Sequence, residues 1–194
     1  MSVGSGGTIS QRGRRDIPAA SFAYKERNIS MADTKNLADL FHDTLKDVYF
    51  AEKKIVDTLP LMNEAAKNGS LKDAFTQHLA ETKVHIERLE QVFEIIGKDP
   101  EPKTCDAILG ITDEGDEIMK EYAGSPALDA GLLAAAQAVE HYEMSRYGTL
   151  RTWALELGLN DAATLLQSTL DEEQATDLAL TSIATSVVNQ NAEG

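Results

Sequence analysis

The chain has 194 residues, 42% of them hydrophobic, and a formal net charge of −14 at pH 7. This length and composition are typical of one globular domain with a sizeable core, and no apolar run approaches the ~20 residues of a membrane-spanning helix. The acidic balance disfavours nucleic acids and anionic membranes as partners, because both repel negative charge.

Residues 1–33 are rich in Gly, Ser and Arg and show little hydrophobic periodicity, so we expect a flexible basic N-terminal tail. Residues 1–30 contain five basic and two acidic residues, a net charge of +3, which leaves −17 for the remainder of the chain. Such a tail could bind DNA weakly or act as an address. An unstructured extension without either role is the simpler expectation.

From residue 34 onward, apolar residues recur at three- and four-residue steps, which is the period of amphipathic helices. Asp33 or Thr34 is the expected N-cap of the first helix and Ser70 that of the second, because short oxygen-bearing side chains satisfy free N–H groups there. Pro60 is expected to kink the first helix. The expected helices span residues 34–67, 71–96, 105–123, 127–157 and 161–188.

Four of these helices are long, and a shorter one separates the second long helix from the third. A chain of this order needs one long connection across the bundle, as ferritin-like bundles have. The sequence therefore predicts an all-α, ferritin-like four-helix bundle over residues 34–190, with a shorter fifth helix in the crossover. Residues 191–194 are expected to fray.

Each long helix carries one glutamate on its apolar stripe, at a similar depth: Glu52, Glu81, Glu143 and Glu173. A carboxylate in a core costs several kcal/mol unless its charge is compensated. For one such glutamate, a solvated helix face would be the better interpretation. Four at matching depth favour compensation by metal ions, and inward carboxylates with a few imidazoles describe a di-iron or di-manganese site.

Other candidate ligands share these helix faces. Glu140 precedes Glu143 by three residues, His78 and His85 flank the second-helix glutamate, and Asp177 follows the last glutamate by four. The spacing departs from the usual Glu-x-x-His motif, so the two histidines and Asp177 are as easily core residues as ligands. His141 is expected on the flank of its helix or as a hydrogen-bond partner of a ligand.

Three tyrosines lie near the predicted ligands in the sequence: Tyr49, Tyr142 and Tyr147. Their phenols could donate hydrogen bonds to the carboxylates or carry oxidising equivalents, although packing alone is the simpler role. Cys105 is the single cysteine, which excludes an internal disulfide and is typical of a reducing compartment. No secretory signal pattern is present at the N-terminus, so we expect a cytoplasmic location.

Several blocks of the chain, in order, are similar to a known family. The most specific are Glu-His-Tyr-Glu at 140–143 and Tyr-Gly-Thr-Leu at 147–150, and others lie at 47–53, 78–82 and 170–177. Over residues 34–190 the sequence resembles the YciE/YciF family of bacterial ferritin-like stress proteins. This resemblance implies a homodimer with a metal site between the long helices, in the bacterial cytoplasm and expressed under stress.

The leading functional hypothesis is a site for two iron ions, bridged by Glu81 and Glu173 by analogy with related sites, that oxidises Fe(II) or removes peroxide. Manganese in the same ligands, with catalase-like disproportionation of peroxide, is an alternative. A third is an interaction protein whose metal is structural or absent.

Overall fold

The computed structural model describes residues 34–193, so the predicted tail at 1–33 lies outside the described residues. These residues contain helices and connections, and no strand. The elements are α1 (Leu37–Ala65), α2 (Gly69–Ile95), α3 (Asp106–Glu121), α4 (Leu128–Glu156) and α5 (Asn160–Ile183), followed by a π-helical turn (Ala184–Val188) and α6 (Asn189–Asn191). The predicted fold, four long helices with a shorter one between the second and third, is confirmed.

Two predicted N-caps are wrong. The cap of α1 is Asn36, whose Oδ1 accepts hydrogen bonds from the N–H groups of Ala38 and Asp39, while the Asp39 carboxylate accepts from the Asn36 N–H. This reciprocal pair is a capping box, which satisfies more free N–H groups than Thr34 alone would. The cap of α2 is Asn68, not Ser70, because extended backbone at Asn68 lets its side chain reach the Leu71 N–H.

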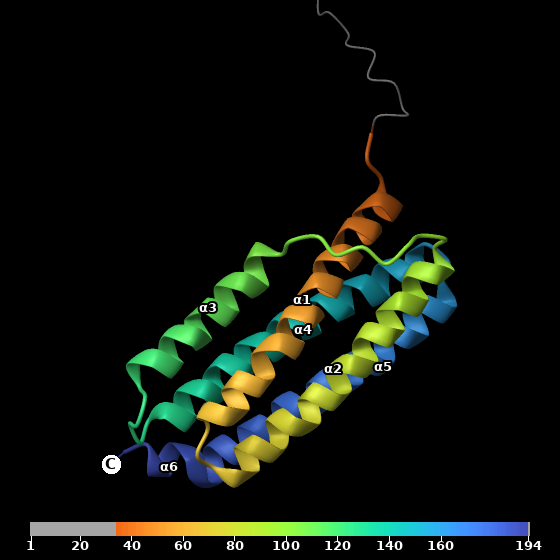
Figure 1. The fold of residues 1–194 in the computed structure, drawn as a ribbon. Helices are drawn as coiled ribbons and strands as arrows, with labels where there is room; N and C mark the ends of the chain where they lie inside the picture. Colours follow the sequence, from red (N-terminus) through yellow and green to blue (C-terminus); the bar gives the residue numbers. More distant parts are fainter. Residues whose placement is uncertain (1–33, 194) are drawn as a thin grey trace, which may run out of the picture. The chain divides into compact units, whose positions relative to one another are not determined.

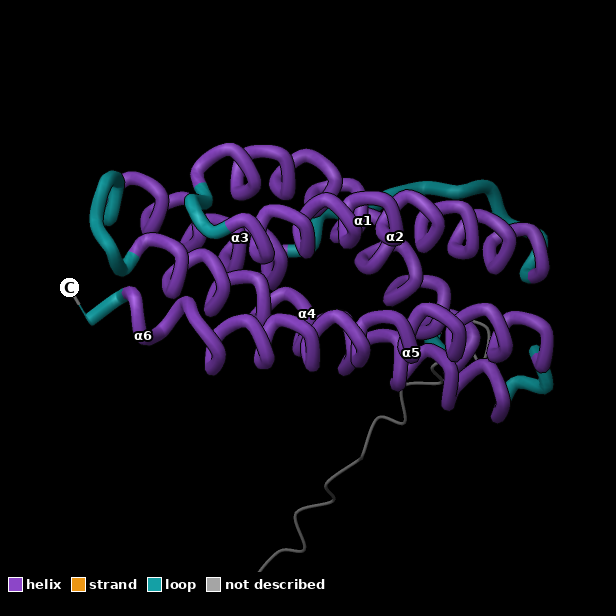
Figure 2. Tube along the Cα trace, turned by 90° about the horizontal axis from the view of Figure 1, so that it is seen from below, coloured by secondary structure: helices purple, strands orange, loops and turns teal. Residues whose placement is uncertain are grey.

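The long helices pack as two antiparallel hairpins, α1 with α2 and α4 with α5 (Figures 1 and 2). The connection after α2 passes across the end of the bundle at which α1 begins, and α3 then packs outside against α4 and α1 (Figure 1). A backbone hydrogen bond from the Lys103 N–H to the Lys46 carbonyl joins this connection to α1, and Lys46 Nζ also donates to Glu101. The crossover explains why α2 and α4, consecutive among the long helices, run in the same direction.

The core consists of two apolar clusters with a polar layer between them. On α1 the change from one cluster to the other falls between Tyr49 and Ala51, just before Glu52, and on α4 it falls between Val139 and Tyr147. The cluster near the start of α1, named here the upper cluster, includes Phe41, Leu45, Leu89, Phe93, Leu150 and Leu166. The lower cluster includes Ile55, Leu59, Leu71, Phe75, Leu132 and Leu180. Within residues 34–193, no helix has the length and apolar content to cross a membrane.

Candidate metal centre

The polar layer contains six glutamate and histidine residues that are at most 2% exposed, and we call them the cluster. Its members are Glu52 from α1, His78 and His85 from α2, Glu140 and Glu143 from α4, and Glu173 from α5. Helical geometry explains the pairs: residues three apart share a face, and residues seven apart return to it after about two turns. All four long helices therefore contribute to one small volume.

The cluster divides into two groups that could each hold a cation. Ligand atoms of His78, Glu140, Glu143 and Glu173 all lie within 4.8 Å of one another, and those of Glu52, His85 and Glu173 do the same. Glu173 belongs to both groups, with Oε2 toward His78 and Oε1 toward His85, so it could contribute to either one.

The histidines lie among the carboxylates at short range. His78 Nδ1 is 3.0 Å from Glu140 Oε1, and its Nε2 is 3.7 Å from Glu173 Oε2 and 3.9 Å from Glu143 Oε2. His85 Nδ1 is 3.0 Å from Glu173 Oε1 and 3.5 Å from Glu52 Oε1. Oxygen and imidazole nitrogen are the donor set expected for iron or manganese.

Most polar atoms of the cluster have no hydrogen-bond partner among residues 34–193. The unpartnered atoms are both oxygens of Glu140, Glu143 and Glu173, together with Glu52 Oε2, His78 Nε2 and His85 Nδ1. Buried polar atoms are normally hydrogen-bonded, because desolvation without a partner costs free energy. A bound cation would satisfy a group of such atoms that lie close together, so these residues fit a metal site.

The pKa values indicate an excess of negative charge. Burial first, and then the charges of Glu173 and Glu52, raise the pKa of Glu140 to about 10. Burial and neighbouring carboxylates likewise raise the pKa of Glu143 well above its usual value. Burial also raises the pKa of Glu173, although its contact with His85 acts in the opposite direction. Without a cation these carboxyls favour their neutral forms.

The two histidines differ in their surroundings. Burial, with a smaller effect of His85, lowers the pKa of His78 to about 3, so its imidazole is neutral and can bind metal. Burial alone would lower the pKa of His85, but its contacts with Glu173 and Glu52 outweigh burial and raise it to about 11. In the metal-free protein, His85 is therefore the positive partner of two cluster carboxylates.

A half-buried Arg–Glu pair contacts the His85 ring on the side of Nε2, opposite the cluster. Glu172 Oε2 is 2.9 Å from His85 Nε2, and both Glu172 oxygens accept hydrogen bonds from the Arg88 guanidinium, at 2.5 and 2.8 Å. This pair orients the ring with Nε2 toward Glu172 and Nδ1 toward the cluster. The Arg88 hydrogen bond also lowers the pKa of Glu172, which keeps that carboxylate charged.

Tyr147 is the tyrosine that contacts the cluster directly. Its phenol is fully buried and donates a hydrogen bond to Glu52 Oε1, which leaves Glu52 Oε2 without a partner. Burial raises the pKa of Tyr147 well above its usual value. Tyr49 instead donates to Glu90, and Tyr142 lies 3.0 Å from the thiol of Cys105.

Two predicted ligands lie outside the cluster. Glu81 is partly exposed and accepts a hydrogen bond from Gln77 on the outer side of α2. Glu81 lies about 60° to one side of His78 around the helix, whereas the buried Thr82 and Leu89 lie to the other side of His78, so Glu81 falls outside the inward face of α2. Asp177, partly buried, contacts Gln137 and His141 of α4. Glu140, and not Glu81, completes the carboxylates of the layer.

Sequence reasoning missed Arg88 and Glu172. Their sequence positions could have suggested a role near the site, since Arg88 follows His85 by three residues and Glu172 adjoins Glu173. Neither lies at the centre of an apolar stripe, and the half-buried pairing between α2 and α5 depends on how the two helices are rotated against each other.

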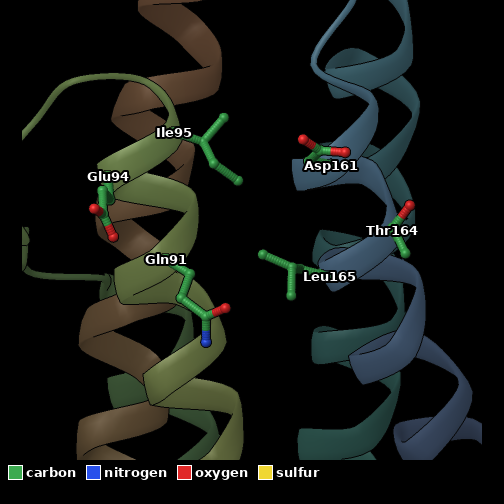
Figure 3. A pocket seen from close by; sticks show the side chains of 6 residues that line it. All are labelled: Gln91, Glu94, Ile95, Asp161, Thr164 and Leu165. Atoms are coloured by element: carbon green, nitrogen blue, oxygen red, sulfur yellow. The ribbon is translucent and has the colours of Figure 1, made fainter.

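A surface hollow lies apart from the cluster, between the last turns of α2 and the first turns of α5 (Figure 3). Ile95 and Leu165 extend into the space between the two helices in this view. None of the six lining residues, Gln91, Glu94, Ile95, Asp161, Thr164 and Leu165, belongs to the cluster.

Four long helices around a buried layer of carboxylates and imidazoles define a helical-bundle protein with a candidate metal centre. The chain belongs to the family described as domain of unknown function DUF892, which matches residues 36–193. The predicted relationship to the YciE/YciF proteins is confirmed.

Individual relatives cover most of the chain. Protein YciF of Escherichia coli K12 is 42% identical over 160 residues, 82% of this chain and 96% of its own length. The crystal structure of that E. coli stress protein matches with a TM-score of 0.77 over 80% of this chain and 99% of the other. YcfI of Rhodopseudomonas palustris, for which a structural role has been suggested, matches at 45% identity with a TM-score of 0.76, over 79% and 98%.

Proposed function

We propose that this protein binds two metal ions, iron or manganese, in the cluster, and that the site oxidises Fe(II) or removes peroxide. One observation carries the proposal: nine oxygen and nitrogen atoms of the six cluster side chains are buried and make no hydrogen bond within residues 34–193, and His85 is a single positive partner among four carboxyl groups. Apolar residues would serve a purely structural core at lower cost. The stress-protein relative is consistent with a role in handling oxidants or iron.

The position of each residue in or beside the cluster determines its expected role. His78, Glu140 and Glu143 would hold one ion, Glu52 and His85 the other, and Glu173 would contact both. Bound iron or manganese would supply one-electron redox chemistry at a site from which water is largely excluded. Tyr147 would hold Glu52 in place, and the Arg88–Glu172 pair would hold His85 with Nδ1 toward the metal.

Elemental analysis by mass spectrometry tests the site. Untagged protein purified without chelator, or loaded anaerobically with Fe(II), should contain about two iron or manganese ions per chain. Glu173→Gln should lose most of this metal, because both groups need that residue. Glu81→Gln removes a carboxylate of the same bundle outside the cluster and should retain the metal.

Unchanged metal content in Glu173→Gln, or no metal after anaerobic loading of the wild type, would contradict the site. Peroxide then separates the activities. The iron form should consume peroxide or oxygen as Fe(III) accumulates, whereas oxygen release by the manganese form alone would indicate catalase-like disproportionation.

A non-enzymatic role is the second candidate, favoured by the structural role suggested for the R. palustris relative. In that case the metal would be structural or absent, and oxidants would not be turned over. For either function we propose a homodimer in the cytoplasm, as the resemblance to the stress proteins implies.

A further inference from the structure

A histidine and an aspartate form an outer pair between α4 and α5. Asp177 Oδ1 lies 3.3 Å from His141 Nε2 and also accepts a hydrogen bond from Gln137 Nε2, at 3.0 Å. The His141 side chain is 68% exposed, whereas that of Asp177 is 19% exposed. The pair therefore extends from solvent toward the interior of the bundle.

A fully buried carboxylate lies near this pair. Glu140 adjoins His141 in α4 and follows Gln137 by three residues, so both contacts of Asp177 are close neighbours of Glu140 on one side of it. Neither oxygen of Glu140 has a hydrogen-bond partner among residues 34–193, and the nearby charge of Asp177 contributes to its raised pKa. Asp177 itself follows Glu173 by four residues, on the same stripe of α5.

We propose that His141 and Asp177 form a surface site that takes up a divalent cation and delivers it to Glu140. The inference rests on the proposed metal function of the cluster. Two ligand atoms bound to one ion at about 2.1 Å are about 3 Å apart when their bonds are perpendicular, close to the separation of this pair. With two protein ligands and the remaining positions held by water, the ion would bind weakly and move on.

Glu81 provides a matched comparison. It is also a partly exposed carboxylate about one turn from the cluster, but it accepts a hydrogen bond from the Gln77 amide instead of contacting a histidine. It lines a small groove between α2 and α5 with Ala74, Gln77, Ala175, Thr176 and Ala179. If cations passed between α2 and α5 instead, Glu81 would be the residue whose loss matters.

The test separates the rate of loading from its end point. Metal-free protein is mixed with Co(II) without oxygen, the absorbance of the bound ion is followed by stopped flow, and the final metal content is measured by mass spectrometry. We expect His141→Ala and Asp177→Asn to slow loading about tenfold with unchanged final content, since each removes one of the two protein ligands of the uptake site and Asp177→Asn also removes a negative charge that attracts cations. Glu81→Gln should load at the wild-type rate.

Each of the other possible results of this experiment would contradict a different part of the proposal. Wild-type rates in both variants, or slowing by Glu81→Gln alone, would overturn the uptake site while leaving the cluster intact. Loss of final metal content in Asp177→Asn would make Asp177 a ligand of the cluster and not a delivery residue. Failure of the wild-type protein to bind Co(II) would instead contradict the proposed function itself.

Discussion

The two apolar clusters and the polar layer between them lie in the same bundle, but burial of their side chains affects the stability of the fold in opposite ways. In the upper and lower clusters, side chains such as Leu45 and Leu132 are buried against other apolar groups and need no partner. In the layer, carboxylates such as Glu143 are equally buried, yet their oxygens have no partner among the described residues. The clusters stabilise the fold, whereas burial of the carboxylates in the layer opposes it unless their charge is compensated.

The largest effect is expected in the apolar clusters. Leu132→Ala removes a fully buried side chain of the lower cluster and should lower the free energy of unfolding by about 2–5 kcal/mol. Urea unfolding of the metal-free protein measures this. Metal content should not change, because Leu132 lies about two turns from Glu140. A neutral effect on stability would show that this cluster is loosely packed.

The opposite sign is expected in the layer. Glu143→Leu replaces a buried, unpartnered carboxyl with an apolar group of similar size and should raise the free energy of unfolding of the metal-free protein by about 1–4 kcal/mol. The same variant should lose metal. Urea unfolding with chelator, compared with Leu132→Ala, checks the sign. Destabilisation by Glu143→Leu would mean that the layer is stabilising without metal.

A smaller effect is expected outside the cluster. Glu172→Ala removes the acceptor of His85 Nε2 and should weaken metal binding about 10- to 100-fold. Glu172→Gln keeps an acceptor oxygen and should stay close to the wild type. Titration with Mn(II) measures the affinity, and the ¹⁵N chemical shifts of His85 report which ring nitrogen carries the proton. Equal affinities in the three proteins would exclude an orienting role.

The smallest effect on stability is expected from a change in pH. The Glu140 carboxyl has a pKa of about 10 in the fold and an ordinary value near 4.3 when unfolded, so the folded state holds the extra proton between these values. Stability of the metal-free protein should therefore be full below about pH 4.3 for this group and fall as pH rises, by up to about 1.4 kcal/mol per unit.

The pKa of His85, raised to about 11, acts in the same direction above about pH 6.5. His78 acts oppositely: with its pKa lowered to about 3, its contribution is lost as pH falls below about 6.5. Melting temperatures at pH 7 and 9 with chelator should thus decrease with pH, and Glu140→Gln should reduce the slope. A flat profile would contradict the excess negative charge assigned to the layer.

Much of the helix plan could be predicted because it depends on local patterns. Gly97, Gly124 and Gly158, at positive φ, lie just beyond the ends of α2, α3 and α4, close to the predicted ends. The N-caps were less predictable. Oxygen-bearing side chains lie at several neighbouring positions, and only the backbone conformation decides which one caps.

The placement of carboxylates and histidines on the inward stripes of long helices follows from the sequence, because a period of 3.6 residues assigns each position to a face. Tertiary structure alone decided which of them meet. Glu140 and Glu81 each lie three residues from a member of the cluster on their own helix, yet only Glu140 belongs to the cluster. Which side of each helix faces inward depends on how the apolar side chains of neighbouring helices pack.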